Sequence, residues 1–283
     1  MKLHLQSAEL FIPDNVPEEA ALTRTTHLAV GAHQDDLEIM AYDGILACFQ
    51  RPDQWFTGVV VTNGGGSPRT DVYSDYTDED MMAVRRVEQK KAAVVGEYAA
   101  QFLLDYPSSV IKNPADTRPV EDLAAILRAT RPQVVYTHNL ADKHDTHVGV
   151  TLRLIEAIRT LPLEARPTAL YGCEVWRDLD WMDDADKVAF DVSGHENLQA
   201  ALLGVFDSQI AGGKRYDLAT LGRRRAHATY HASHGVDVTT GTTFAMDLTP
   251  CIQEPGLDPA EHVQAHIGRF EKEVLGRLAK LRG

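Results

Sequence analysis

The sequence predicts an α/β fold, with a mostly parallel sheet covered by helices on both faces and a C-terminal α+β elaboration. Short apolar runs alternate with longer helical patterns through roughly the first 170 residues. The runs are apolar at nearly every position, as are strands buried on both faces of a parallel sheet. Helices between successive strands provide the right-handed crossovers that parallel strands require. Together these observations predict a Rossmann-like arrangement.

Five runs are expected to form the strands of this sheet, because each is short and rich in residues that favour strands. They are residues 26–30, 56–62, 101–104, 133–137 and 168–173. The helical patterns between them cover residues 37–49, 81–98, 120–129 and 148–159. Pro119 suits the first turn of the third helix, and Asp80 is expected to cap the second.

The last third of the chain is less regular. Its expected strands are residues 187–192 and 241–248, and its expected helices are residues 196–206, 218–230 and 259–281. The glycine-rich loop at residues 63–78 lacks the Lys-Ser/Thr of a phosphate-binding loop, so we expect a flexible turn there.

The composition is that of an ordinary globular protein. The chain has 283 residues, of which 44% are hydrophobic and 24% are charged, enough apolar material for one large core. We expect a single domain over residues 1–283, with its core at about 24–175 and the elaboration at about 176–283.

The charge and the cysteines limit the class of partner. A net charge of −13 argues against binding to nucleic acid or anionic membranes, which need basic surface, but is compatible with a local basic pocket. No apolar run approaches the roughly 20 residues of a membrane span, and the N-terminus lacks the features of a secretory signal. Cys48, Cys173 and Cys251 are far apart and odd in number, as expected of reduced, buried thiols. We expect a cytoplasmic protein with a small-molecule partner, and the sequence leaves a homo-oligomer open.

Two polar clusters follow the first and fourth predicted strands. Residues 31–38 read GAHQDDLE, and residues 138–147 read HNLADKHDTH. Both clusters lie at the carboxyl edge of the sheet, where open α/β folds bind ligands at the point where strand order reverses. If the two strands are neighbours, the clusters face each other across that crevice.

The residue types in these clusters suit a metal site. His33, Asp36 and His147 supply the three ligands of a catalytic zinc-type site, which keeps one position open for water. Asp35 remains beside the ion and can accept a proton from the bound water, whose acidity the cation raises. His144, one helical turn before His147, can polarise a carbonyl or protonate a leaving amine.

Each cluster alone has a plainer interpretation. A His-x-Asp-Asp is common at the start of a helix, where acidic residues are favourable, and a His-x-x-His can serve on a surface or as a cap. Two such clusters at the ends of two predicted parallel strands are harder to attribute to chance. The metal site is therefore the interpretation that we favour.

The two clusters resemble the paired motifs of the LmbE-like (PIG-L type) N-deacetylases. Residues 32–38 (AHQDDLE) are similar to the family's Ala-His-Pro-Asp-Asp-x-Glu. Residues 137–147 resemble its second motif, a His and Asp followed by His-Pro-Asp-His. The residues Thr-Asn-Gly at 62–64 resemble the family's Thr-Asp-Gly after the second strand. Order and spacing agree over about residues 26–150.

Two further motifs resemble those of the same family. Arg85 and Glu88 are spaced as in its Arg-x-x-Glu helix, and Arg85 stands where the family places a substrate-contacting arginine. A plain surface pair at i,i+3 is the alternative for these two residues. Beyond residue 150 only Ser208-Gln209 resembles a family motif, a His-x-Ser-Gln that here begins with Phe206.

The resemblance implies a zinc-dependent hydrolase acting on N-acetylglucosamine-type groups. Known members include deacetylases of glycosylphosphatidylinositol, mycothiol and bacillithiol synthesis, and some antibiotic-tailoring enzymes. By motif position the metal ligands are His33, Asp36 and His147, the general base is Asp35, and His144 is the electrostatic or acid catalyst.

The departures from the family pattern concern the substrate more than the metal. Gln34 replaces a proline, which changes only rigidity. Thr146 replaces an aspartate that would orient the catalytic histidine, a role left for Asp142 or Asp145. Ser108 stands where many members have an aspartate that contacts a sugar hydroxyl.

The C-terminal third is therefore expected to set the substrate, through a rim over the metal. Specific polar contacts must come from elsewhere when the usual aspartate is missing at position 108. We expect His231 and His234 to bind the substrate. The wider group of expected donors is Arg223, Arg225, His227, His231 and His234.

The predicted function is a metal-dependent hydrolase that removes an N-acyl group, expected to be acetyl, from an amino sugar or its conjugate. Two alternatives stay open on the sequence. An amidase of the mycothiol-conjugate type would keep the same catalytic residues, and a non-catalytic ligand-binding protein would keep only the fold. Asp35 argues against the second alternative, because such a protein needs no base beside the metal, whereas Thr146 argues mildly for it.

Overall fold

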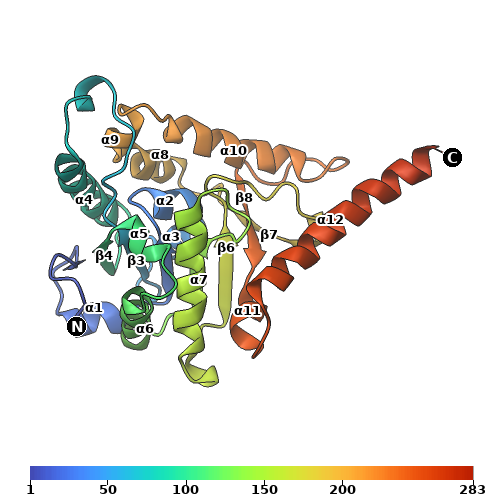
Figure 1. Ribbon diagram of the computed structural model, residues 1–283. Helices are drawn as coiled ribbons and strands as arrows, with labels where there is room; N and C mark the ends of the chain where they lie inside the picture. Colours follow the sequence, from blue (N-terminus) through green and yellow to red (C-terminus); the bar gives the residue numbers. More distant parts are fainter. Residues whose placement is uncertain (283) are drawn as a thin grey trace.

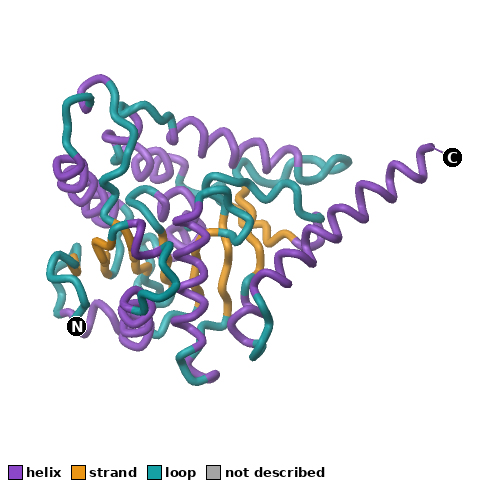
Figure 2. Tube along the Cα trace, in the orientation of Figure 1, coloured by secondary structure: helices purple, strands orange, loops and turns teal. Residues whose placement is uncertain are grey.

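The computed structural model describes residues 1–282 and contains an eight-stranded sheet between two layers of helices (Figures 1 and 2). The strands are β1 (Glu9–Phe11), β2 (His27–Gly31), β3 (Phe56–Thr62), β4 (Ala100–Tyr106), β5 (Val134–His138), β6 (Ala169–Cys173), β7 (Lys187–Asp191) and β8 (Thr242–Asp247). Their order is β1-β4-β3-β2-β5-β6-β8-β7. The strands from β4 to β6 in this order run parallel, and the strands at both edges pair antiparallel.

Both faces of the sheet are buried, because its central strands are apolar at successive positions. In β2, Leu28 and Val30 join one core and Ala29 joins the other. The first core is covered by α1 (Glu18–Thr23), α6 (Arg118–Thr130), α7 (Asp145–Arg159) and α11 (Thr249–Gln253). The second is covered by α2 (Asp36–Met40), α3 (Tyr42–Cys48), α4 (Asp78–Val95) and α8 (Glu196–Gly204).

The remaining helices lie at the margins of these layers. They are α5 (Ser108–Ile111), α9 (Asp207–Ile210), α10 (Tyr216–Tyr230) and α12 (Pro259–Arg282), with 3-10 turns η1 (Asp71–Tyr73), η2 (Leu163–Ala165) and η3 (Asp184–Asp186). Helix α12 projects away from the sheet and carries the C-terminus (Figure 1). Within residues 1–282 no helix combines the length and apolarity needed to cross a bilayer.

The predicted α/β class with a mostly parallel sheet is confirmed, and the two strands that precede the polar clusters are neighbours. These are β2 and β5, which pair in parallel. Strand β1 was not predicted, because three residues give too short a pattern. The helix expected at residues 37–49 is two helices, α2 and α3, which meet at Ala41.

Asp80 was expected to be the N-cap of α4, but it is not. Thr77 is the N-cap, and its hydroxyl accepts a hydrogen bond from the backbone N–H of Asp80. The Asp80 carboxylate in turn accepts one from the backbone N–H of Thr77, at 3.0 Å. Asp80 is therefore the third residue of a capping box, because an acidic side chain can occupy either end of this motif.

Glu38, in α2, is a fully buried carboxyl group, and the stability of the protein should depend on its protonation. Its Oε1 accepts hydrogen bonds from Gln89 Nε2 at 2.9 Å and from the Tyr98 hydroxyl at 2.8 Å. Burial raises its pKa from the usual 4.5 to about 7. The folded state therefore holds this proton more tightly than the unfolded state does. Its contribution to stability is fully present below pH 4.5 and is lost as the pH rises towards 7.

We expect Glu38→Gln to remove the decrease in stability that Glu38 causes as the pH rises, because glutamine resembles the protonated acid. Relative to the wild type, the variant should gain on the order of 2–3 kcal/mol in unfolding free energy between pH 5 and pH 8. Urea denaturation at both pH values measures the difference. Glu271→Gln, an exposed charge on α12, is the matched control. A difference between Glu38→Gln and wild type that does not change with pH would contradict the assignment.

Candidate metal centre and active site

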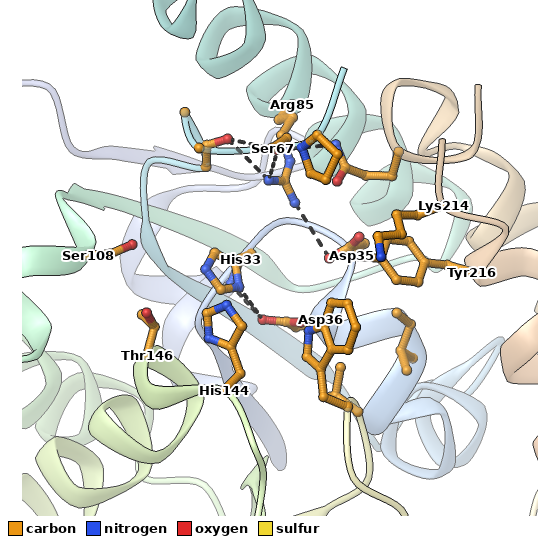
Figure 3. A pocket seen from close by; sticks show the side chains of 18 of the residues that line it. His33, Asp35, Asp36, Ser67, Arg85, Ser108, His144, Thr146, Lys214 and Tyr216 are labelled. Carbon is orange, nitrogen blue, oxygen red and sulfur yellow. Dashed lines mark hydrogen bonds and ion pairs between the residues drawn. The ribbon is translucent and has the colours of Figure 1, made fainter. Parts of the chain in front are cut away.

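The two polar clusters meet at the carboxyl edge of the sheet. His33 lies in the turn after β2, and Asp36 begins α2. His144 is the N-cap of α7, and His147 lies in the first turn of that helix. Because β2 and β5 are adjacent and parallel, the segments that follow them emerge side by side (Figure 3).

His33, Asp36 and His147 bring three ligand atoms together in a small triangle. His33 Nδ1 lies 3.2 Å from His147 Nε2 and 3.3 Å from Asp36 Oδ2. Asp36 Oδ2 lies 3.5 Å from His147 Nε2. Ligand atoms about 2.0–2.1 Å from a tetrahedral ion are about 3.3–3.4 Å apart. The spacing of the three residues therefore fits the expected ligand set.

Two groups of side chains at this place could hold a metal ion: His33, His144 and His147, and Asp36, His138 and His147, with His138 at the end of β5. His138 Nε2 is 3.4 Å from Asp36 Oδ2, but it also accepts a hydrogen bond from the backbone N–H of Ala32 at 2.9 Å. That bond uses the nitrogen lone pair that a metal would need. The geometry therefore favours His33 over His138 as the third ligand.

Asp142 contacts both histidines of the second cluster, His144 and His147. It is buried, and its Oδ1 lies 3.7 Å from His147 Nδ1. The same oxygen accepts a hydrogen bond from the backbone N–H of His144 at 2.9 Å. The separation from His147 is longer than a hydrogen bond, and His147 Nδ1 has no hydrogen-bond partner among residues 1–282. Asp142 thus holds the backbone of His144 by a hydrogen bond and lies beside the His147 ring, whereas Asp145 is exposed.

The ring of His144 is held by aromatic contacts rather than by a carboxylate. Its centroid is 4.6 Å from that of His147, with the rings stacked, and 6.3 Å from that of Trp176. Its Nδ1 has no hydrogen-bond partner among the described residues. Burial lowers its pKa, and the charge of His147 lowers it further. The ring is therefore neutral near pH 7 and has a nitrogen free to bind a ligand.

Asp35 occupies a buried and strained position beside the triangle. Its φ is 97°, a positive value that few non-glycine residues adopt and that aspartate tolerates better than most. Its Oδ1 lies 3.6 Å from Arg85 Nη2 (Figure 3). Burial raises its pKa well above the usual value, although the Arg85 charge acts in the opposite direction. A carboxyl with raised proton affinity is suited to accept and return a proton near neutral pH.

Arg85 ties the glycine-rich loop to the first motif. Its Nη1 donates to Gly64 O at 3.1 Å and to Ser67 Oγ at 2.5 Å. Its Nη2 donates to Gln34 O at 2.5 Å. Arg85 and Glu88 are both buried, so they do not form the solvated surface pair considered as the alternative.

The Ser208-Gln209 motif packs against the same helix. Glu88 Oε2 accepts a hydrogen bond from Ser208 Oγ at 2.6 Å, and its Oε1 accepts one from the backbone N–H of Ser208 at 2.8 Å. Gln209 Nε2 reaches Ser67 Oγ at 3.4 Å. The two isolated motifs of the sequence therefore form one contact that holds α9 against α4.

A cavity of about 450 Å³ opens over the triangle. His33, Asp35 and Asp36 line it beside Arg85 and His144 (Figure 3). Its other side chains, not predicted from the sequence, include Lys112, Trp176, Lys214 and Tyr216. Ser108 and Thr146 also face it, and both are hydroxyl side chains where the family has carboxylates.

The histidines expected at the rim do not line this cavity. His227 is buried against Phe244, with ring centroids 4.2 Å apart, and its Nε2 lies 3.7 Å from Glu174 Oε1. His231 also packs on Phe244, at 5.2 Å, and His234 is exposed after α10. The helical spacing that suggested a polar rim instead turns two of these rings towards β8.

The two arginines of that group are not among the residues that line the cavity, although Arg223 lines an adjoining hollow. Arg223 Nη1 donates to the backbone carbonyl of Val175 at 2.7 Å, and Arg225 lines a separate hollow near Thr240. The C-terminal third still contributes a wall of the cavity, through Trp176, Lys214 and Tyr216. Substrate contacts by His231 and His234 therefore have no support in the geometry.

Comparison with known proteins gives a family match over part of the chain. A sequence model of the family PIG-L, described as GlcNAc-PI de-N-acetylase, matches residues 28–158, which include both motifs. Comparison with curated proteins gave no match.

Several solved structures share the fold. GalB, the 4-carboxy-2-hydroxymuconate hydratase of Pseudomonas putida KT2440, is 17% identical with a TM-score of 0.61, over 79% of this chain and 95% of that one. N,N'-diacetylchitobiose deacetylase of Pyrococcus horikoshii is 18% identical with a TM-score of 0.59, over 78% and 83%. Dbv21, the deacetylase of the A40926 pseudoaglycone, is 15% identical with a TM-score of 0.56, over 79% and 97%.

At such identities the structural likeness shows the fold alone, whereas the sequence match includes the residues that form the triangle. The matched segment runs from β2 through most of α7 and contains Asp35, Arg85 and His144 as well. Over residues 28–158 the chain is therefore similar to the PIG-L (LmbE-like) family, in the part that carries both motifs.

Proposed function

We propose that the protein is a metal-dependent hydrolase that removes an N-acyl group, most simply acetyl, from an amino sugar or amino-sugar conjugate. The observation that carries the proposal is the triangle of His33, Asp36 and His147, with Asp35 buried beside it. The family match and two deacetylases among the structural neighbours support the same reaction. The neighbouring hydratase shows that the fold is compatible with other chemistry, so activity must be measured.

We assign a separate role in the reaction to the ligand triangle, to Asp35 and to His144. His33, Asp36 and His147 would hold a divalent cation, which we propose to be Zn²⁺. Such an ion makes a bound water more acidic and polarises a carbonyl oxygen. Asp35 takes the proton of the attacking water, and His144 donates a hydrogen bond to the carbonyl oxygen as negative charge develops there.

The alternatives from the sequence are distinguished by substrate. A mycothiol-conjugate type amidase would use the same side chains on a different amide, so N-acetylglucosamine, N,N'-diacetylchitobiose and a thioether conjugate should be compared for amine release. A non-catalytic binding protein would release none of them. The buried Asp35 beside the ligand triangle favours an enzyme, because binding alone does not need a proton acceptor there.

We expect one divalent ion per chain, and we expect His147→Ala to lose most of it. His147 is fully buried and contributes one corner of the ligand triangle, so its removal leaves two ligands. Elemental analysis of the purified proteins measures the stoichiometry. His227→Ala, a buried histidine outside the cavity, is the matched control and should keep its metal. Unchanged metal content in His147→Ala would overturn the assignment.

A further inference from the structure

Helix α12 leaves the body of the protein about halfway along its length. In its first half, His262 Nε2 donates a hydrogen bond to the backbone carbonyl of Asp247 at 2.8 Å. The Phe270 ring lies edge to face with Trp181, with ring centroids 6.2 Å apart. Among residues 1–282, no hydrogen bond, ion pair or ring contact joins residues 271–282 to another element. This second half, which we call the arm, projects beyond the rest of the fold (Figure 1).

An apolar stripe runs along the arm and remains exposed. It follows a spacing of seven, four and three residues, which keeps side chains on one face of a helix. Its members are Ile267, Val274, Leu278 and Leu281, with Leu275 beside them. Leu275, Leu278 and Leu281 are 55%, 48% and 77% exposed. Single exposed leucines are common on protein surfaces, but a continuous series on one projecting helix is typical of an interaction surface.

The tip of the arm is basic. It carries Arg277, Lys280 and Arg282. Within residues 1–282, Arg277 pairs with Glu273 of the same helix, and the other two form no ion pair. The tip therefore presents positive charge in a protein whose net charge is −13.

The segment at the base of the arm is acidic. Residues 178–186 contain five aspartates and no lysine or arginine. The segment lies against the start of the arm, because it contains Trp181, which contacts Phe270. Arg269 and Lys187 pair with aspartates of this segment. Two cations against five carboxylates leave the base with a net negative charge.

A second copy of the chain carries the surface that matches both ends of the arm. When two arms lie antiparallel, their apolar stripes face each other and each basic tip reaches the acidic base of the other copy. With a two-fold axis between residues 276 and 277, Leu275 of each copy lies opposite Leu278 of the partner subunit, and the tip lies level with residue 271. Such a contact is self-complementary, as a two-fold interface requires. Parallel arms would instead bring the two basic tips together.

An anionic membrane is the other kind of surface that attracts a basic amphipathic helix. The acidic base lies beside the arm and would be repelled by such a membrane, whereas the antiparallel pair uses the charges of both the tip and the base. The charge distribution therefore favours a second copy.

We propose that α12 is a dimerisation arm, which pairs in antiparallel orientation with α12 of a second copy of this chain. The apolar stripe supplies the contact area, and the pairing of tip with base fixes the orientation. The inference is independent of the proposed function, because no residue of α12 lines the cavity over the ligand triangle.

Analytical ultracentrifugation of the full chain over a range of concentrations tests the dimer. We expect a monomer–dimer equilibrium with a dissociation constant on the order of micromolar, because about twelve residues of each helix make a small interface. Leu278→Glu should weaken the dimer about tenfold or more, since it places a charge opposite Leu275 of the partner subunit. Leu218→Glu, at an exposed leucine on α10, is the matched control and should associate like the wild type.

Two charge-reversed variants test the orientation. The tip variant carries Lys280→Glu and Arg282→Glu, and the base variant carries Asp178→Lys and Asp180→Lys, all at exposed positions. Each variant alone should dimerise about tenfold more weakly, because tip and base then carry like charge. An equal mixture of the two should recover a heterodimer, in which both tip-to-base contacts are again complementary. The tip variant should bind the wild type more weakly than the wild type binds itself.

Each result either supports or overturns the proposal. A chain that stays monomeric up to about 200 µM overturns it, because such a dimer would then be weaker than the micromolar range. A dimer that Leu278→Glu leaves unchanged overturns the role of α12. Stronger binding of the tip variant to the wild type indicates parallel arms, and a mixture without heterodimer excludes the tip-to-base contact. Vesicles of phosphatidylcholine with and without phosphatidylglycerol provide the last arm: a monomer that sediments only with the anionic vesicles would assign α12 to a membrane and refute the dimer.

Discussion

Replacing Asp35 with asparagine is expected to lower kcat about 10²–10⁴-fold while the metal content stays unchanged. The side chain lies beside the ligand triangle but is not part of it, since Asp36 supplies the carboxylate corner. Asparagine has nearly the same shape and cannot take a proton from water near neutral pH. The substitution therefore removes one chemical function and leaves the ligands in place.

Asparagine is also the gentlest substitution that the backbone allows at this position. Asp35 has a φ of 97°, and aspartate and asparagine are among the few non-glycine residues that tolerate positive φ. Glutamate or alanine would combine the loss of function with backbone strain. A loss of turnover in Asp35→Asn can therefore be attributed to chemistry, provided that thermal unfolding and metal content match the wild type.

Asp145→Asn is the matched control, since it removes the same charge from an exposed side chain next to His144. We expect it to keep near-wild-type turnover. Steady-state kinetics on the best substrate, with elemental analysis of each variant, makes the comparison. Near-wild-type kcat in Asp35→Asn would show that this carboxylate is not the base.

The meeting of the two polar clusters could be predicted from the sequence because two strong local signals are joined by one topological rule. The clusters that contain His33 and His147 each follow an apolar run, and open parallel sheets place ligands where such runs end. This rule brings the two clusters together only if the strands before them are neighbours. Strands β2 and β5 are neighbours, as the pairing of His27 with Val134 shows. Arg85 entered through a motif alone, and its contacts with Gln34 and Ser67 needed the structure.

The cavity wall could not be predicted in this way. Lys112, Trp176 and Lys214 lie in irregular segments without periodicity, and tertiary packing alone brings them over the metal site. His231 and His234, expected at the rim, are not among the residues that line the cavity, for the converse reason. Spacing along a helix shows which residues share a face but not what that face packs against, and here β8 lies under part of it.

His138 shows that the sequence alone also cannot choose between histidines of the motifs as metal ligands. Its position at the end of β5 makes it as plausible a ligand by sequence as His33. The hydrogen bond from the backbone N–H of Ala32 to its Nε2 distinguishes the two, because a nitrogen that accepts this bond is not free for a metal. Contacts of this kind depend on strand register, which sequence patterns do not specify to a single residue.

Replacing His144 with alanine is expected to lower kcat by about 10²–10³-fold, roughly 3–4 kcal/mol, the usual cost of losing a preorganised donor to a developing oxyanion. KM should change little, because the donor acts mainly on charge that appears in the transition state. The structure gives His144 the attributes of such a donor: it lines the cavity, burial keeps its ring neutral, and its Nδ1 has no hydrogen-bond partner among residues 1–282.

The His144 ring also stacks on His147, so a merely structural role must be tested separately. His144→Gln provides that test, because glutamine keeps an N–H donor but cannot replace the stacked ring. If the ring serves only to support the ligand, both variants should lose metal together, and added Zn²⁺ should restore turnover. If His144 is the donor, both should keep their metal, and glutamine should recover part of the kcat lost in the alanine variant. Full turnover in His144→Ala with normal metal content would exclude both roles and would leave the carbonyl oxygen to the cation alone.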